Sequence, residues 1–351
     1  MKLIIQIPCY NEAETLPVTL ADLPRAVEGF DRVEWLVIND GSTDDTARVA
    51  REHGADHVVS HTRNQGLARA FMTGLDACLN LGADVIVNTD ADNQYNAADI
   101  PALVKPVLDK RADIVVGARP INGIKHFSLL KKILQNIGSW VVRKVSGTDI
   151  PDAPSGFRAF SREAAMRLNV FNQYTYTLET IIQAGQKNMA ITSVPVRVNE
   201  DLRPSRLLKS VPSYVQRSIM TIARIFVVYK PFRFFFAIGA VLFGIGTLIG
   251  IRFLWYYFAG DGAGHVQSLI LAAVLLISGF QTILVAFLAD VLAANRKMLE
   301  DVKYNLSIQR FDNNYHNKNN KQPIQVPVNK QQIKFVEKTY FENKPVRSKI
   351  V

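Results

Sequence analysis

Two apolar segments in the C-terminal half of the chain are the feature that most limits its fold. Residues 234–251 carry no charge over 18 residues, and residues 266–289 carry none over 24. About 20 apolar residues are enough for a helix to cross the hydrocarbon core of a bilayer. The alternative, two buried core helices of a soluble domain, would leave the outer faces of both helices uncovered. We therefore expect a membrane region over residues 232–292, with helices at about 234–256 and 266–289.

The charges that flank these segments predict how the hairpin is oriented. Cations gather on the outer side of each segment, at Arg224, Lys230, Arg233, Arg296, Lys297 and Lys303. The connection between the segments carries Asp261 and His265, with Arg252 as its one nearby cation. Because loops rich in Lys and Arg stay on the cytoplasmic side, we expect two spans with the catalytic domain and both termini in the cytoplasm.

The basic balance of the chain belongs mostly to its C-terminal tail. The formal net charge is +10, and residues 296–351 hold 12 Lys and Arg against 5 Asp and Glu. This distribution does not favour nucleic acid as a partner. Residues 313–332 are rich in Asn, Gln and Lys, a composition typical of disorder, so we expect a basic, partly disordered tail over 296–351. We assign the tail no catalytic role.

The first 210 residues alternate between strand-like and helix-like patterns. Short apolar runs occupy residues 3–7, 35–38, 57–59, 85–88 and 114–116, and helix-like stretches lie between several of them. Such alternation predicts an α/β domain with a mostly parallel sheet. Polar clusters at residues 8–12, 39–45 and 89–94 follow three of the runs directly. Ligands gather beyond the carboxyl ends of parallel strands, so these three loops are expected to meet at one site.

The cluster after the fourth run is the strongest candidate for a metal site. Asp90 and Asp92 lie two residues apart at a strand end, and Gln94 adds an amide oxygen. Hard oxygen ligands of this kind suit Mg²⁺ or Mn²⁺ bridging a diphosphate. Asp residues also cap polar turns, so the pair alone does not decide between the two interpretations.

The other clusters are partly explained by helix starts. Residues 8–12 end a strand and begin a helix, where backbone donors favour an anion or a polar base edge. In residues 39–46, Gly, Ser, Thr and Asp fit a turn and helix caps, and Asp40 is the member we expect to contact a ligand. Arg63 is followed by Gly66, and this stretch fits either a phosphate contact or a helix cap.

Together these motifs resemble glycosyltransferase family two, in its dolichyl-phosphate mannose synthase-like branch. The ordered motifs are Pro8-Cys9-Tyr10-Asn11-Glu12, Asp40-Gly41-Ser42-Thr43-Asp44, Asn64-Gln65-Gly66 and Asp90-Ala91-Asp92-Asn93-Gln94. The resemblance implies a Rossmann-like glycosyltransferase-A domain over residues 1–210. That domain is followed by interfacial helices and the two-helix transmembrane hairpin.

The resemblance also implies roles for individual residues. The nucleotide-sugar would be bound by Pro8, Tyr10, Glu12, Asp40, Asp90, Ala91 and Arg203. The metal would be held by Asp90, Asp92 and Gln94. Arg119 and Lys132 would hold the acceptor phosphate, so that Asp90, Asp92 and Arg119 form the catalytic set. The stretch Arg203-Pro204-Ser205-Arg206 departs from the Gly- and Lys-containing version of the family, which leaves the donor contacts of that loop open.

The expected reaction is inverting transfer of a hexose from a UDP- or GDP-sugar to polyprenyl phosphate. A phosphate monoester has a second pKa near 6 and needs no protein base at neutral pH. Two alternatives remain. A hydroxyl acceptor would need a carboxylate base, for which Asp152 or Glu179 is available, and a catalytically silent chain could act as a membrane scaffold. The sequence lacks a Gln-x-x-Arg-Trp motif, which argues against a processive synthase.

Two cationic segments are expected to lie on the membrane surface. Residues 124–145 and a juxtamembrane helix at residues 205–230 mix Lys and Arg with apolar residues at helical spacing, although solvated helix faces show the same pattern. Cys9 and Cys78 have no spacing that indicates a disulfide or zinc site, so both are expected to be buried thiols. The sequence leaves open whether the chain forms a homo-oligomer.

Overall fold

The computed structural model describes residues 1–120, 129–170, 176–200, 220, 224, 227–260 and 262–319. The chain divides into one unit at residues 1–308 and a second at residues 309–351. Most of the juxtamembrane helix expected over residues 205–230 lies outside the described residues. The membrane-surface segment at 124–145 is described from residue 129 onward, where it forms a helix.

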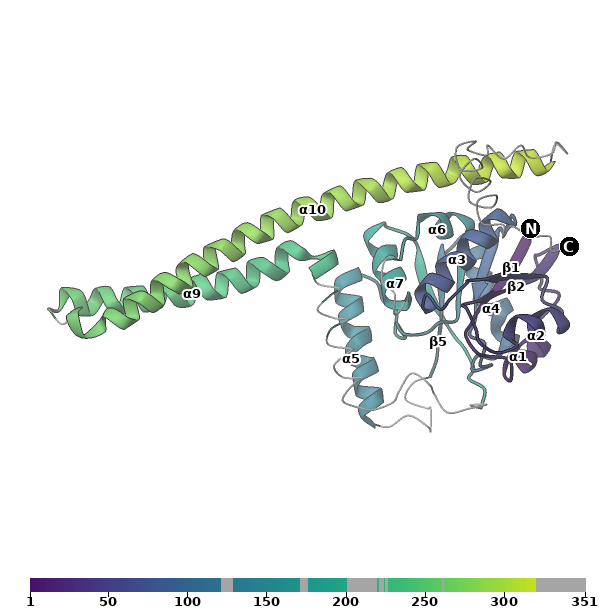
Figure 1. Ribbon diagram of the computed structural model, residues 1–351, viewed down its shortest axis with the longest axis horizontal. Coiled ribbons are helices and arrows are strands. Elements are labelled where there is room, and N and C mark those ends of the chain that lie inside the picture. Colours follow the sequence, from purple (N-terminus) through teal and green to yellow (C-terminus); the bar gives the residue numbers. More distant parts are fainter. Residues whose placement is uncertain are drawn as a thin grey trace, which may run out of the picture. The chain divides into compact units, whose positions relative to one another are not determined.

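The described chain alternates between strands and helices before it becomes entirely helical (Figure 1). The strands are β1 (Lys2–Cys9), β2 (Arg32–Asn39), β3 (His57–Ser60), β4 (Val85–Asn88), β5 (Ile114–Ala118), β6 (Arg158–Ser161) and β7 (Ile191–Pro195). The α-helices are α1 (Leu16–Asp22), α2 (Thr46–Glu52), α3 (Leu67–Asn80), α4 (Ile100–Leu108), α5 (Leu129–Ser146), α6 (Arg162–Arg167), α7 (Thr177–Gln186), α9 (Pro231–Phe258) and α10 (Val266–Asn319). The 3₁₀ turns among the described residues are η1 (Ala97–Asp99) and η3 (Gly262–His265).

The strands form one seven-stranded sheet in the order β3-β2-β1-β4-β6-β5-β7. Among the described strands, β6 alone runs antiparallel to its neighbours, and the other pairings are parallel. The predicted α/β domain with a mostly parallel sheet is therefore confirmed. The chain goes from β1 to β2 on one side and returns to β4 on the other, so the order switches at the β1–β4 pair. Ligands of such sheets bind at this type of switch point.

Burial on both faces explains why the strands are continuous apolar runs. In β1, Leu3, Ile5 and Ile7 pack in a core cluster with residues of α1 and α4. The alternate residue Gln6 faces α3, because a Cβ on Gly74 of that helix would meet its side chain. Figure 1 shows helices on both sides of the sheet.

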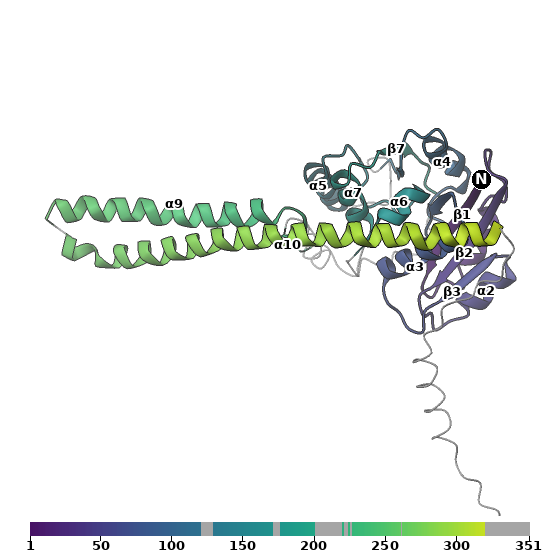
Figure 2. The ribbon, with the colours of Figure 1, turned by 90° about the horizontal axis from the view of Figure 1, so that it is seen from above.

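The helices α9 and α10 are long and apolar enough to cross a membrane. Only 11% and 17% of their most apolar windows are buried within the protein, so they are not core helices of a soluble domain. They run side by side in both ribbon views (Figures 1 and 2). Their backbones approach closely at Gly239 and Gly279, where a Cβ on Gly279 would lie 2.9 Å from the Gly239 carbonyl oxygen. Small residues permit such close packing between membrane helices.

The second of these helices is longer than expected. The apolar run ends at Ala289, but α10 continues to Asn319 without a break. Residues 313–319, which their composition predicted to be disordered, are therefore helical. The remaining part of the tail, from residue 320, lies outside the described residues.

Candidate active site

Three polar loops meet at one edge of the sheet, as the sequence predicted. They follow β1, β2 and β4, which are neighbours in the sheet. The β1–β2 register pairs Cys9 with Asn39, and the β1–β4 register pairs Gln6 with Asn88. The strands therefore end close together, and each continues directly into one of the predicted clusters.

The loop after β4 is shaped by local and distant hydrogen bonds. Asp92 Oδ1 accepts a bond from the backbone N–H of Gln94 at 3.2 Å. Asn93 has a left-handed φ of 54°, which Asn tolerates better than most residues, and its Nδ2 donates to Asp22 at 2.7 Å. Asn199 Nδ2 donates to the Asn93 carbonyl at 2.9 Å. These three bonds hold the loop and use only Oδ1 of the Asp92 carboxylate.

Asp90 packs against Gly156, where any side chain would collide with the Asp90 carboxylate. A Cβ on Gly156 would lie 3.0 Å from both Asp90 carboxylate oxygens and 3.0 Å from Tyr176 Oη. The backbone of Gly156 is fixed, because its N–H donates to Tyr95 Oη at 2.9 Å and its carbonyl accepts from Asn88 Nδ2 at 2.9 Å. The loop at residues 153–156 therefore closes over Asp90 through its last residue, Gly156.

The charge environment of Asp90 favours a bound cation. Desolvation, followed by repulsion from the Asp92 carboxylate, raises the pKa of Asp90 to about 7. A divalent cation would relieve this repulsion. Among the described residues, no group of three or more His, Cys, Asp or Glu side chains is arranged to hold a metal by itself. Asp90, Asp92 and Gln94 thus offer oxygen ligands that fit a hard cation, and diphosphate oxygens and water would supply its remaining ligands.

Substitution of Gly156 tests this close fit. The variant Gly156→Ala is expected to lower the turnover rate about tenfold, because the added methyl group displaces the Asp90 carboxylate. Gly138→Ala is the matched control, since a Cβ there meets nothing within 4 Å and alanine favours the helix α5. Steady-state transfer assays on both variants make the measurement. Equal rates for the two variants would contradict the assigned contact.

The loops after β1 and β2 are tied to each other. Asn11, with a φ of 56°, donates its N–H to Ser42 Oγ at 3.0 Å and accepts the Thr43 N–H at 2.8 Å through Oδ1. The Glu12 N–H donates to Thr46 Oγ1 at 2.9 Å. Tyr10 is 43% exposed at the same edge. The loops that carry Tyr10, Glu12 and Asp40 are therefore joined to each other.

Asp40 is buried and has several partners within the protein. Its Oδ1 contacts His61 Nδ1 at 2.6 Å and accepts the Gln65 N–H at 2.9 Å, while Oδ2 accepts the Gly66 N–H at 2.9 Å. The His61 ring also contacts Thr73 Oγ1 at 3.0 Å. Asp40 thus fixes the loop that precedes α3, and its contact with a nucleobase stays a prediction. Sequence reasoning missed His61, which has no motif around it.

Arg119 follows β5 and forms a buried ion pair with Asp152. Its Nε and Nη2 donate to the two carboxylate oxygens at 2.7 and 3.1 Å, and its backbone N–H donates to Oδ2 at 3.1 Å. The side chains are 7% and 1% exposed. The guanidinium carbon also lies 5.8 Å from the centre of the Tyr95 ring. Asp152 is therefore the partner that holds Arg119, and it has almost no exposed oxygen with which to accept a proton.

Arg158 also belongs to the site, although the sequence analysis assigned it no role. It is fully buried in β6, where burial lowers its pKa to about 10, so it stays charged at neutral pH. Nε and Nη2 donate to the Ser155 and Ala153 carbonyls at 2.8 Å each, and Nη1 donates to Thr180. Arg158 thus supports the loop that closes over Asp90.

The remaining predicted residues differ in how much of them the structure describes. The Arg203 side chain and the Lys132 side chain lie outside the described residues, so their phosphate contacts stay predictions. Glu179 lies in α7, and its Oε1 accepts from Tyr229 Oη at 2.7 Å. Pro8 lies in β1 and Ala91 lies buried between the two aspartates.

Comparison with known proteins shows which family the N-terminal domain is similar to. The family model described as glycosyl transferase family 2 matches residues 4–168. An undecaprenyl-phosphate mannosyltransferase from Micrococcus luteus is 30% identical over 218 residues, which cover 59% of this chain and 88% of that protein. A UDP-N-acetylglucosamine–dolichyl-phosphate N-acetylglucosaminyltransferase from Methanococcus voltae is 29% identical over 213 residues, covering 54% of this chain and 83% of that protein.

A solved structure has the same fold. The crystal structure of glucosyl-3-phosphoglycerate synthase from Mycobacterium tuberculosis, in complex with phosphoglyceric acid, superposes with a TM-score of 0.50 at 24% identity. The match covers 63% of this chain and 79% of that chain. The predicted glycosyltransferase-A type of fold is therefore confirmed for the N-terminal domain.

Proposed function

Because this chain belongs to glycosyl transferase family 2, we propose that it transfers a hexose from a UDP- or GDP-sugar to polyprenyl phosphate. The reaction is metal-dependent, inverts the anomeric centre and takes place at the cytoplasmic membrane face. The observation that carries the proposal is that Asp90 lies close enough to both the Asp92 carboxylate and the Asp152-bound Arg119 guanidinium for their charges to shift its pKa. The names of the two relatives, which are polyprenyl-phosphate glycosyltransferases, support the acceptor.

The donor side follows from the first three loops. Pro8, Tyr10, Glu12 and Asp40 line the edge where the nucleoside binds. Asp90, Asp92 and Gln94 would hold Mg²⁺ or Mn²⁺, which when bound neutralises the charge that develops on the nucleoside diphosphate. The rigid loop around Asn93 holds Asp90 and Asp92 in a fixed arrangement before the substrate arrives.

The acceptor side follows from Arg119. Its guanidinium is held in a fixed direction by Asp152, and it carries the positive charge that attracts a phosphate. A phosphate monoester is already ionised at neutral pH and attacks the anomeric carbon without a protein base. The burial of Asp152 beside Arg119 favours this acceptor over a hydroxyl, because a hydroxyl would need an accessible base.

The two apolar helices would anchor the catalytic domain at the membrane surface. Exposed apolar side chains along α9 and α10 would be stable in lipid and costly in water. A hairpin through the bilayer keeps the site near the head groups of lipid substrates. Flanking cations favour a cytoplasmic catalytic domain, with both termini on the same side.

Transfer of label into lipid tests the proposal. The full chain in detergent is incubated with Mn²⁺ or Mg²⁺, polyprenyl phosphate and a panel of radiolabelled UDP- and GDP-sugars. We expect label in the organic-extractable lipid, lost when EDTA removes the metal. Label in a glycan without label in lipid would move the acceptor to a hydroxyl. No turnover with any donor would favour a catalytically silent membrane scaffold.

A further inference from the structure

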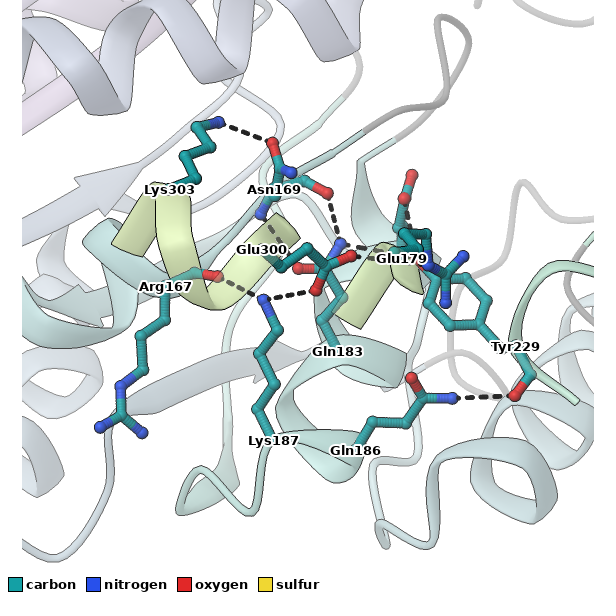
Figure 3. A network of polar contacts seen from close by, with 10 residues as sticks. Arg167, Asn169, Glu179, Gln183, Gln186, Lys187, Tyr229, Glu300 and Lys303 are labelled. Atoms are coloured by element: carbon teal, nitrogen blue, oxygen red, sulfur yellow. Dashed lines mark hydrogen bonds and ion pairs between the residues drawn. The ribbon is translucent and has the colours of Figure 1, made fainter. Parts of the chain in front are cut away.

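The part of α10 beyond its apolar region contacts the catalytic domain. Lys187, directly after α7, places its Nζ 2.9 Å from Glu300 Oε2, and Lys303 Nζ donates to Asn169 Oδ1 at 2.7 Å. Figure 3 shows both contacts, with Glu300 and Lys303 projecting from α10 toward the domain. We call residues 296–304 of α10 the brace segment.

The Lys187–Glu300 pair is shielded from solvent. The side chains of Lys187 and Glu300 are 16% and 8% exposed. Charges with so little exposure are found paired, because an unpaired charge would be costly to desolvate. Lys187 Nζ also donates to the Arg167 carbonyl at 2.6 Å, which ties the pair to the end of α6. The contact is therefore built into the packing rather than formed between mobile surface side chains.

Side chains on one face of α7 contact Tyr229, which in turn contacts the brace segment. Glu179, Gln183 and Gln186 are spaced by four and three residues and so lie on the same side of the helix. Gln186 Nε2 donates to the Tyr229 carbonyl at 3.3 Å, and Glu179 accepts from the Tyr229 hydroxyl (Figure 3). The Arg296 guanidinium of the brace segment lies 4.7 Å from the centre of the Tyr229 ring.

Gln183 provides a second connection on the same face. Its Oε1 accepts the Asn169 N–H at 3.0 Å, and its Nε2 donates to the Asn169 carbonyl at 2.5 Å. The Asn169 side chain in turn accepts from Lys303. The brace segment thus contacts Lys187, the residue that follows α7, through Glu300, and it reaches α7 itself through Tyr229 and Asn169.

A different residue of α7 reaches the active site. Thr180 accepts a hydrogen bond from Arg158, and Arg158 holds the Ala153 and Ser155 carbonyls. Gly156, which follows Ser155, is the residue against which Asp90 packs. The helix α7 therefore stands between the brace segment and the loop that closes over the proposed metal site.

We propose that the brace segment is a positioning element for catalysis. By fixing α7 it keeps Arg158 and the loop at residues 153–156 in the arrangement that the Asp90 site requires. The expected effect on catalysis rests on the proposed function. The structural connection from the brace segment through α7 to residues 153–156 does not depend on it. Because α10 is continuous from the apolar region through the brace segment, the arrangement of the site depends on a helix that also anchors the chain.

Two single variants and their combination test the link. Lys187→Met leaves the Glu300 carboxylate with only its longer pair to Arg296 Nε at 3.6 Å, and Glu300→Met leaves the Lys187 ammonium without a carboxylate, so both should loosen α7. The double variant removes both charges of the pair and places two apolar side chains in contact, while Arg296 keeps its contact with the Tyr229 ring. The full chain is reconstituted in nanodiscs, and hydrogen exchange is followed by mass spectrometry. In the single variants we expect about tenfold faster exchange in peptides from residues 176–187 and 150–160, with recovery in the double variant.

The kinetic readout separates positioning from general damage. Each single variant should lower kcat for lipid glycosylation about tenfold and leave the KM for the nucleotide-sugar within about twofold, with recovery in the double variant. Glu52→Met is the matched control, because it removes one member of the exposed Arg48–Glu52 pair on α2. It should change neither readout.

Three results would overturn the proposal. The first is unchanged exchange in the single variants, and the second is faster exchange in α7 without any change at residues 150–160. The third is a double variant no better than the worse single variant. If the wild-type chain does not glycosylate polyprenyl phosphate, the proposed function fails, but the exchange measurement still decides whether the brace segment controls the loop.

Discussion

Asp92→Asn is expected to lower metal-dependent transfer by about a thousandfold, the size of effect seen when one preorganised electrostatic contact to the leaving charge is lost. Asparagine keeps a side-chain oxygen that accepts the Gln94 N–H, so the loop can retain its conformation. It removes one of the two negative charges available to the cation. The variant thus separates the charge of Asp92 from its structural bond.

Two measurements make this prediction specific. Initial rates of transfer are compared for the wild type, Asp92→Asn and Asp109→Asn, where Asp109 is an exposed acid at the end of α4 that pairs with Arg111. Stabilisation of the fold by Mn²⁺ with a nucleoside diphosphate is followed by thermal unfolding, since a ligand that binds the native state raises Tm. We expect loss of both signals in Asp92→Asn alone. A rate within tenfold of the wild type would remove Asp92 from the metal site.

The sheet and its ligand edge were predictable because local pattern and tertiary structure agree there. Strands β1 and β4 are apolar runs buried on both faces, and the polar residues that follow them can lie only at the carboxyl edge. The position of Asp90 and Asp92 at this edge could therefore be predicted from the sequence alone. Family membership, which the ordered motifs suggested, is confirmed by the comparisons.

The strand β6 was harder to predict because it breaks the usual composition of a buried strand. It contains Arg158, and arginine is rarely buried completely. Its hydrogen bonds go to carbonyls of the loop just before the strand and to Thr180. Only the three-dimensional structure shows that these acceptors surround the guanidinium.

The pairing of Arg119 with Asp152 was also hidden from the sequence. Both residues were recognised as candidates, but 33 positions separate them and no periodicity links them. The structure brings the end of β5 beside the loop before β6, so the two side chains form one unit. We therefore propose that Asp152 orients Arg119 instead of acting as a base.

The length of α10 shows how tertiary contacts extend a helix beyond its apolar pattern. The apolar run stops at Ala289, and the following polar composition predicted a tail. The helix continues, and Glu300 and Lys303 find partners on the catalytic domain. These partners come from distant parts of the chain, so local composition carried no signal for them.

The Arg119–Asp152 pair leads to the second large expected effect. Asp152→Ala leaves the Arg119 guanidinium buried without its carboxylate, and loss of one member of a buried pair costs about 3 kcal/mol or more. For a domain of this size that corresponds to a fall in Tm of about 6 °C or more. Transfer to polyprenyl phosphate should fall at least about a hundredfold, because the cation is no longer held in place.

A double-mutant cycle distinguishes orientation from proton transfer by Asp152. If Asp152 orients Arg119, then Arg119→Met should be as inactive as Asp152→Ala, and the double variant should be more stable than either single variant while remaining inactive. If Asp152 is instead the base for a hydroxyl acceptor, Arg119→Met frees its carboxylate and should retain activity, and Asp152→Asn should alter the pH dependence of kcat. The first pattern is the one that the two carboxylate–guanidinium bonds and the 1% exposure of Asp152 lead us to expect.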